Sequence, residues 1–461
     1  MVTEVIPVEY SKVASKVSLR LIPFMLVLYV VSYLDRINIS FASLQMNATL
    51  QISAEEYGFG SGIFFFGYCL FGIPSNLLIE KLGPRRWISI IMVVWGFITL
   101  AMCLLRNQTE FYVLRFILGI AEAGFFPGMI LYLTYWFSPK YYGAAVARFM
   151  SAIPLAGLLG SGVASWALGM TAYGLAGWKW LFIATGLPAV LLGFIVWFVL
   201  DDKPRNAKWL NAAEIESLER EATANICDET EREEAVGEPG NTESETSQKD
   251  RADSAGSEGY RSAKTDSAGS RFVATLLDVT VWRFALLYFS LTTSMYGFQL
   301  WLPQIIKTFG DLSDQTTALV SAIPALFQAL GMLIIAGHSD KTQERRFHVV
   351  LAAICTCSGL AITCIAPLAW IKLAGLCLAA FGIWGSVGPF WALTTNNLTK
   401  RSQATGIAIV NSVGNLGGFA GPSIVGLIKQ YSHGFNDALI ALAVASVIAI
   451  IIAITSPRGR S

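Results

Sequence analysis

The sequence predicts an all-α integral membrane protein with twelve spanning helices, arranged as two pseudo-symmetric six-helix bundles. Of its 461 residues, 54% are hydrophobic and only 14% are charged, and the mean hydropathy is +0.54. A hydrocarbon core about 30 Å thick requires roughly 20 apolar residues per spanning helix. Runs of that length recur along the whole chain, so a water-soluble protein is excluded.

The apolar runs give the expected order of the spanning helices. They cover 21–44, 57–79, 87–105, 111–136, 144–167, 178–200, 281–304, 316–337, 347–367, 370–395, 403–428 and 436–455.

The charges indicate the orientation of the chain. The formal net charge is +1, which gives no indication of a nucleic-acid partner. Most Lys and Arg residues fall in the segments that share one side of the membrane with the N-terminus. By the positive-inside rule, both termini of this multi-pass protein are expected in the cytoplasm, with the cell inner (plasma) membrane as its location.

The chain divides into two halves around a polar segment. We expect a bundle over 1–200, a largely disordered cytoplasmic loop over 201–280 and a second bundle over 281–461. Within the loop, 212–222 is compatible with a helix. An offset of 260 aligns Glu80–Trp87 with Asp340–Phe347, which indicates that the six-helix unit is duplicated.

The two aligned loops each combine an acid with a pair of arginines. Such groups can form a charge clamp in one conformation and release it in another. The alternative is a static anchor that obeys the positive-inside rule. The candidate gating residues are Glu80, Arg85, Arg86, Asp340, Arg345 and Arg346.

Four ionisable residues stand inside apolar runs. Asp35 and Arg36 are adjacent in the first run, and Arg115 and Glu122 lie seven residues apart in the fourth. An Asp or Arg at the centre of a spanning helix costs roughly 2.5–3.5 kcal/mol, so these groups need partners, water or a ligand. They predict a polar cavity through which a charged species passes.

The types of residue indicate a division of roles. A guanidinium suits a carboxylate because it offers paired donors in one plane, so Arg36 and Arg115 are candidates for substrate binding. Carboxyl groups can carry protons, so Asp35 and Glu122 are candidates for proton coupling. The alternative is that Asp35–Arg115 or Arg36–Glu122 form permanent ion pairs.

Neutral polar and aromatic residues supply a second set of candidates. In the first half Tyr33 and Asn38 flank the charges, whereas no embedded acid or base appears in the second half. Neutral donors and aromatic walls suit hydroxyl groups or a ring on the substrate. Each aromatic is equally explained by packing or interfacial anchoring. The second-half candidates are Tyr296, Gln299, Trp391, Asn411 and Asn415.

Metal, cofactor and nucleotide chemistry are not indicated. His338, His348 and His433 stand in loops or at helix ends without a second expected ligand, and Cys355 and Cys357 make no zinc pattern. No Walker loop is present, so direct use of ATP is not expected. We expect no cofactor and no enzymatic activity.

Several long motifs resemble those of a known family. They are YLDRIN at 33–38, the loop at 80–87, FYVLRFILGIAEAGFFPG at 111–128, GWKWLF at 177–182, YGFQLWLPQIIK at 296–307 and SDKTQERRFHV at 339–349. The chain resembles the major facilitator superfamily, and within it the anion:cation symporter family of tartrate, galactonate, hexuronate and phthalate carriers. Glu80 departs from the usual Asp of the first loop motif.

The resemblance implies a secondary active transporter. It links the acids at 35 and 122 to proton coupling and the arginines at 36 and 115 to the substrate or the coupling network. We therefore expect alternating-access symport of a small organic carboxylate with H⁺, with tartrate or a sugar acid favoured, by a monomer in the lipid bilayer. The alternatives are an anion exchanger, a Na⁺-coupled carrier, or a non-transporting sensor built on a transporter fold.

Overall fold

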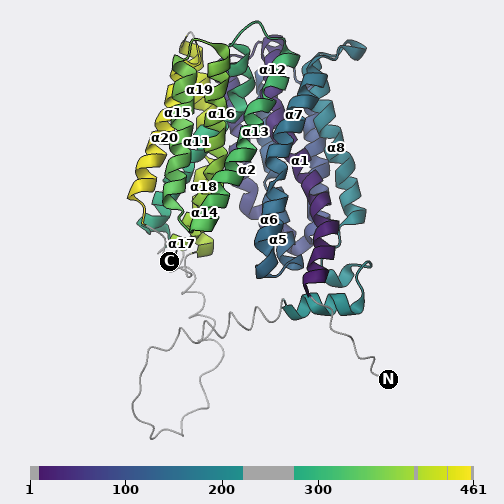
Figure 1. Ribbon diagram of the computed structural model, residues 1–461. Coiled ribbons are helices and arrows are strands. Elements are labelled where there is room, and N and C mark those ends of the chain that lie inside the picture. The colour runs from purple at the N-terminus through teal and green to yellow at the C-terminus, as the bar shows by residue number, and fades with distance from the viewer. Residues whose placement is uncertain (1–9, 222–274, 399–402, 433, 458–461) are drawn as a thin grey trace, which may run out of the picture.

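The computed structural model describes residues 10–221, 275–398, 403–432 and 434–457, apart from the side chains at 73, 76, 80 and 404. Within these ranges all of the extended regular structure is helical. The first helix begins and the last helix ends at the same end of the bundle, at the bottom of Figure 1. We call this end the terminal face and the other end the opposite face.

The first half contains the helices that end before the polar segment. They are α1 (Tyr10–Leu50), α2 (Ala54–Leu82), α3 (Pro84–Ala101), η1 (Met102–Leu104), α4 (Gln108–Glu122), α5 (Phe125–Trp136), α6 (Pro139–Met150), α7 (Ala152–Leu168), η2 (Ala172–Gly174) and α8 (Gly177–Val199). A short turn, η3 (Pro204–Asn206), and a helix over 212–221 follow at the terminal face.

The second half repeats this plan. Its helices are α11 (Val279–Lys307), α12 (Asp314–Val320), α13 (Ala322–Gly331), η4 (Met332–Ala336), α14 (Gly337–Thr342), α15 (Arg346–Ile365), α16 (Ala369–Gly385), α17 (Val387–Asn397), α18 (Gln403–Asn415), α19 (Gly417–Tyr431) and α20 (Asn436–Thr455). The expected disordered part of the central loop lies outside the described residues.

The helices account for the predicted spans. In the described ranges, nine continuous or slightly broken helices are long and apolar enough to cross a membrane. Three further spans, namely α2, α11 and α18–α19, are richer in glycine and polar residues and complete the expected twelve. The predicted fold class is confirmed.

Three of the spans are interrupted by the same local signal. A helix break at Ser151 precedes Pro154, and a break at Ser321 precedes Pro324 within an identical Ser-Ala-Ile-Pro sequence. Ser386 stands in the same relation to Pro389. Proline has no N–H for the carbonyl four residues earlier and its ring clashes with that carbonyl, so the helix bends there.

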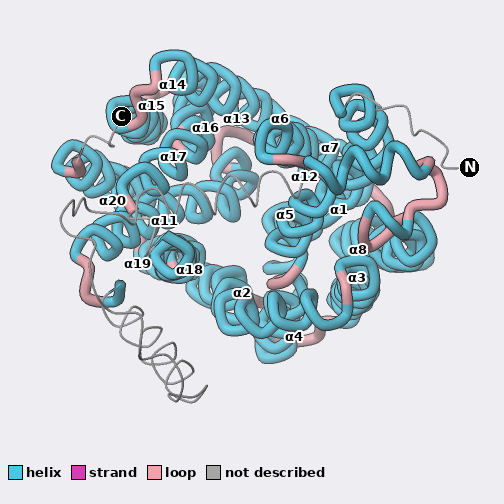
Figure 2. The backbone as a smooth tube through the Cα atoms, turned by 90° about the horizontal axis from the view of Figure 1, so that it is seen from below, coloured by secondary structure: helices cyan, strands magenta, loops and turns pink. Residues whose placement is uncertain are grey.

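The two halves contact each other along two seams. Along the first, α2 packs on α19, and a Cβ added to Gly58 would lie only 2.5 Å from the Pro422 carbonyl oxygen. Along the second, α7 packs on α12 and α13, with Gly157 against Ala325. Small residues allow the backbones to approach closely at both seams. The view from the terminal face shows the halves meeting along these helices (Figure 2).

Hydrogen bonds join the halves on the side of the opposite face, whereas the ribbons diverge toward the terminal face (Figure 1). The donors are side chains of the first two helices and of α11. These bonds are Tyr57 Oη to the Leu300 carbonyl at 2.7 Å, Gln304 Nε2 to Ser43 Oγ at 2.8 Å, and Gln45 Nε2 to Asp314 Oδ2 at 3.1 Å.

Candidate functional site

Asp35 lies in the middle of α1, fully buried inside the first half. Its Oδ1 accepts a hydrogen bond from Asn38 Nδ2 at 2.8 Å, and its Oδ2 accepts one from Thr99 Oγ1 at 2.6 Å. Asn38 Nδ2 also donates to Thr185 Oγ1 at 2.9 Å. Both partners of the carboxyl group are therefore neutral, and Asn38 is directed into the first bundle.

Arg36 forms an ion pair with Glu122. Arg36 Nη2 lies 3.1 Å from Glu122 Oε2, and the side chains are 13% and 0% exposed. Glu122 Oε1 and Arg36 Nε have no hydrogen-bond partner among the described residues. The contact thus uses one donor and one acceptor, and it leaves capacity on both groups for a ligand or a proton.

Arg115 is buried behind this pair. Its Nη2 donates to the Ser61 carbonyl at 3.2 Å, whereas Nε and Nη1 have no partner in the described part of the chain. Arg115 Cζ lies 4.8 Å from the ring centroid of Phe64, and Arg36 Cζ lies 5.4 Å from the same centroid. One aromatic ring therefore stabilises both guanidinium groups by cation–π contact.

The geometry decides between the two expected ion pairs. Arg36–Glu122 is formed, whereas Asp35 and Arg115 form no ion pair in the described residues. Asp35 adjoins Arg36 in α1, and Arg36 and Arg115 share the ring of Phe64. All four charges therefore belong to one cluster on α1 and α4, and only Arg36 retains appreciable exposure.

Two of the predicted tyrosines lie where the halves meet. The Tyr33 ring is in edge contact with Trp384, with centroids 6.0 Å apart, and its hydroxyl has no partner among the described groups. The Tyr296 ring packs on Phe65 at 4.2 Å. Both contacts cross from one half to the other, beside the charged cluster.

Gln299 forms part of a polar contact that the sequence analysis missed. Gln328 Nε2 donates to Gln299 Oε1 at 2.9 Å, and Gln328 Oε1 has no partner in the described ranges. A small cavity between the halves is lined by both amides together with Ser40 and Ser161. The available signal was the presence of an amide side chain in the apolar span 316–337.

The remaining second-half candidates form a separate group. Asn415 Nδ2 donates to Asn411 Oδ1 at 3.1 Å, and the Asn411 side chain is exposed. Trp391 packs against Tyr288 with centroids 5.0 Å apart, beside a buried apolar core of the second half. The structure therefore brings together Asp35, Arg36, Arg115 and Glu122, whereas Asn411 and Asn415 bond to each other and Trp391 packs on aromatic rings of its own half.

Comparison with known proteins agrees with this architecture. The family model described as Major Facilitator Superfamily matches residues 25–422. A protein of Agrobacterium vitis named "Putative tartrate transporter" is 39% identical over 454 residues, which cover 97% of this chain and 96% of the relative. A "Quinolone resistance transporter" of Acinetobacter baumannii is 37% identical over 439 residues, which cover 95% and 93%. The chain belongs to the major facilitator superfamily.

A solved structure supports the fold of this facilitator. A bacterial homologue of the human lysosomal transporter Spinster, in an inward-facing and unoccupied conformation, superposes with a TM-score of 0.71 at 17% identity, covering 96% of this chain and 97% of that one. Together the comparisons show a multi-pass membrane protein that is a secondary transporter of organic substrates and not an enzyme.

The two loop motifs of the facilitator are bonded within their own halves. Arg85 N–H donates to Asp202 Oδ1 at 2.9 Å, and Arg85 Nε donates to the Trp197 carbonyl at 2.5 Å. Arg86 is exposed. The side chain of Glu80 lies outside the described residues, so its expected part in the clamp stays a prediction.

The second loop contains more contacts. Arg345 Nη1 forms an ion pair with Asp340 Oδ1 at 2.5 Å, and Arg346 Nη1 donates to the Ser456 carbonyl at 3.0 Å. These bonds hold the loop against the end of α20 in the same half. The structure therefore shows an acid–arginine ion pair within the second-half loop, and its release in another conformation stays a prediction.

The expectation that the histidines stand alone was wrong for two of them. His338 Nδ1 and His348 Nε2 are 2.8 Å apart, and His348 Nδ1 is 2.9 Å from Glu344 Oε2. The turn between α14 and α15 brings the rings together, which sequence spacing did not reveal. His433 lies outside the described residues.

Proposed function

We propose that this transporter carries a small organic carboxylate together with protons. The observation that carries the proposal is the Arg36–Glu122 pair, in which the arginine is partly exposed and the acid is completely buried. A substrate carboxylate can approach Arg36, whereas bulk water does not reach Glu122 directly. Binding of the anion to Arg36 and binding of the proton to Glu122 would therefore both act on the same ion pair.

Competition for Arg36 provides the coupling step. A carboxylate that binds the guanidinium in a paired geometry weakens its single contact with Glu122. Glu122 would then be an uncompensated buried charge, which is strongly unfavourable, and the uptake of a proton removes that cost. Substrate binding and protonation of Glu122 thus favour each other.

Asp35 would act as the second proton carrier. Its two oxygens have only neutral donors, Asn38 and Thr99, so its charge is not balanced by direct contact. Thr99 is on α3 and Asn38 also contacts Thr185 on α8. A change in the protonation of Asp35 would therefore alter packing among three helices of the first half.

Alternating access would move the halves about their seams. The positive-inside rule places the terminal face in the cytoplasm. The halves are bonded near the opposite face and diverge toward the terminal face, which with this orientation supports an inward-facing state. Closing the terminal face would engage the loops that contain Arg85 and Arg345.

The neutral groups favour a hydroxylated acid as substrate. Tyr33, Gln299 and Gln328 offer hydroxyl and amide groups between the halves, beside the charged cluster. The relative named for tartrate agrees with this chemistry. The relative named for quinolone resistance has an almost equal identity, so the pocket, and not the family, selects the substrate.

Uptake by reconstituted vesicles tests the proposal. A panel of organic acids would be offered with an imposed pH gradient, an imposed sodium gradient or neither. Accumulation should follow the pH gradient. Asp35→Asn and Glu122→Gln should abolish pH-driven accumulation, whereas counterflow exchange of the substrate should survive in at least one of them. Asp437→Asn, at the start of α20, is the matched control and should behave as the parent protein.

Two outcomes would contradict the proposal. Accumulation driven by sodium alone would assign the coupling ion differently, and full pH-driven uptake in both acid variants would remove these carboxyl groups from the mechanism.

A further inference from the structure

A basic pocket lies at the terminal face, away from the charged cluster. Its walls are the first turns of α1 and the segment that follows the first bundle. It is lined by Lys12, Ser15, Lys16, Leu19, Arg20 and Trp209. From this pocket we infer a binding site for the phosphodiester headgroup of an anionic phospholipid.

The first turns of α1 have two distinct faces. Val13, Ala14 and Val17 are buried against the protein, whereas the five pocket residues of this helix are exposed. The three cations follow one another at intervals of four residues, so they form a stripe along one face. A phosphate group opposite this stripe would meet positive charge over about two helical turns.

The height of the pocket matches the headgroup region. Helix α1 has 41 residues, which corresponds to about 60 Å and exceeds the hydrocarbon thickness of about 30 Å. The apolar run of the helix begins at Leu21, directly after Arg20. Leu19 is 76% exposed, which places an apolar side chain beside the cations and suits an acyl chain below the headgroup.

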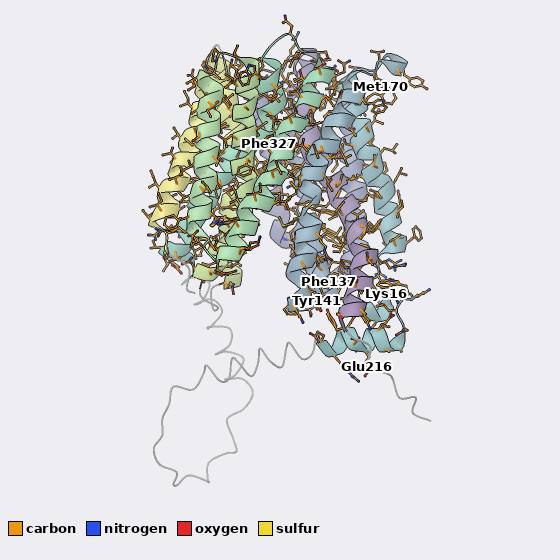
Figure 3. The ribbon with its side chains drawn as sticks, in the orientation of Figure 1. Lys16, Phe137, Tyr141, Met170, Glu216 and Phe327 are labelled. Atoms are coloured by element: carbon orange, nitrogen blue, oxygen red, sulfur yellow. The ribbon has the colours of Figure 1, made fainter. Side chains whose placement is uncertain are left out.

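Aromatic and ionic contacts hold the opposite wall in place. Arg20 Cζ lies 4.9 Å from the ring centroid of Trp209, and this ring stacks on Trp136 at 5.7 Å. Tryptophan is favoured at membrane interfaces. Lys16 Nζ contacts Glu214 Oε1 at 2.7 Å, which ties α1 to the helix over 212–221. Figure 3 labels Lys16 of α1 and Glu216 of that helix at this end of the molecule. The pocket is therefore a formed structure and not a chance group of surface lysines.

The charge balance favours an anion over a neutral lipid. Glu214 offsets Lys16, and Lys12 also has an interaction of its own. Arg20 lies against an aromatic ring and forms no ion pair with an acid among the described residues. Lys208 adds another exposed cation next to Trp209. Basic pockets beside spanning helices attract anionic headgroups, each Lys or Arg near the surface contributing about 1 kcal/mol.

Native mass spectrometry of the full-length protein tests the site. The protein would be exchanged into mixed micelles that contain phosphatidylglycerol or phosphatidylcholine of identical acyl chains. Phosphatidylglycerol should be retained more strongly. The double variant Lys12→Gln/Arg20→Gln should lose that preference by about tenfold. The double variant Lys140→Gln/Arg106→Gln removes two other exposed cations of the same half and should keep the preference.

Further arms separate a lipid site from a folding defect and from a general phosphate site. Arg20→Lys keeps the charge and should largely keep the preference, which a folding defect would not allow. Thermal unfolding in detergent shows whether the variants remain folded. Glycerol 3-phosphate alone should not protect the protein against thermal unfolding to the extent that phosphatidylglycerol does. Equal retention of the two lipids, an unchanged double variant, or full protection by the water-soluble phosphate would each overturn the inference.

Discussion

The first spans of the two halves occupy equivalent places but use different chemistry. Helix α1 contributes Asp35 and Arg36, and the latter pairs with Glu122 of α4. The offset of 260 places Tyr296 of α11 opposite Arg36 in this alignment. In the described second half, α11 uses only neutral polar groups in its interior, among them Ser294, which donates to the Leu442 carbonyl at 3.0 Å.

This difference separates charge from shape. The first half contains the groups that can bind an anion and exchange protons, while the second half lines the interface with aromatic rings and amides. If this division holds, substitutions in the first half should change coupling, and substitutions in the second half should change substrate preference.

The largest effect is expected for Arg36→Ala. This change removes the partner of the buried Glu122 carboxyl group and the proposed anchor of the substrate. Uptake should fall by at least about a hundredfold, because breaking a buried pair costs roughly 3–5 kcal/mol and about 2.8 kcal/mol already corresponds to that factor. Initial rates of uptake by vesicles at constant protein density measure the effect.

The equivalent position in the second half is the control. Tyr296→Phe keeps the ring that packs on Phe65 and removes only a hydroxyl group. Its uptake should remain within a few-fold of the parent protein and should stay coupled to pH. Similar losses of uptake in both variants would show that the two positions matter equally, and would contradict the division of charge and shape between the halves.

A smaller effect is expected for Gln328→Leu. The change leaves Gln299 Oε1 without its donor at 2.9 Å and removes the unpartnered oxygen of Gln328 from the cavity. The Michaelis constant for a hydroxylated acid should rise by about tenfold, since a lost hydrogen bond in a buried site costs about 1–3 kcal/mol. Dependence on the pH gradient should persist.

The acid panel makes this test specific. A substrate without hydroxyl groups should be affected less than tartrate by Gln328→Leu. An equal loss for every acid would indicate a packing defect and would remove this amide pair from substrate selection.

A still smaller effect is expected when a hydrogen bond that joins the two halves is removed. Tyr57→Phe removes the hydrogen bond from Tyr57 Oη to the Leu300 carbonyl at 2.7 Å. A net contribution of about 1 kcal/mol corresponds to a shift of about fivefold away from the conformation described here. Distances between spin labels at the opposite face of the two halves report that population.

The matched variant is Tyr112→Phe. Tyr112 accepts a hydrogen bond from Gln108 within the first half, so its loss should leave the population unchanged. A shift of equal size in both variants would argue against the Tyr57 contact as a lock between the halves.

The sequence predicts the spans and the charged cluster well for physical reasons. Hydrocarbon thickness sets helix length, and an ionisable group such as Asp35 in an apolar run is costly enough to be conspicuous. The sequence could not decide whether Asp35–Arg115 or Arg36–Glu122 forms an ion pair, because that depends on how α4 is rotated against α1. The identical Ser-Ala-Ile-Pro breaks at Ser151 and Ser321 were readable in the sequence but were not recognised.

The contacts made by turns were beyond sequence reasoning. His338 and His348 are ten residues apart, and they meet only because Gln343 adopts a left-handed conformation with φ of 55° at the end of α14. Gln328 was overlooked because a neutral amide in an apolar span costs far less than a charge, so it attracts less attention.

The smallest predicted effect concerns Glu344, which has no acidic counterpart in the first-half loop, where the aligned residue is Pro84. Partial burial raises the pKa of Glu344, but hydrogen bonds from the Phe347 N–H and from His348 outweigh it and hold the pKa below its ordinary value. Its stabilising contribution is therefore present above the unfolded pKa of about 4.3 and is lost as the pH falls through the lower, folded value. Because the group is partly exposed, we expect it to contribute less than about 1 kcal/mol to the free energy of unfolding.

Thermal unfolding followed by intrinsic fluorescence measures this contribution of Glu344. The unfolding midpoint should fall less steeply at acidic pH for Glu344→Gln than for the parent protein. Glu110→Gln, which alters an acid that accepts a hydrogen bond from the Arg106 N–H at 2.9 Å beside the start of α4, should leave the second-half loop unchanged. An identical pH profile for Glu344→Gln and the parent protein would mean that this loop adds no acid-sensitive contact to the second half. The proposed role of the loop in closing the terminal face would not be affected by that result.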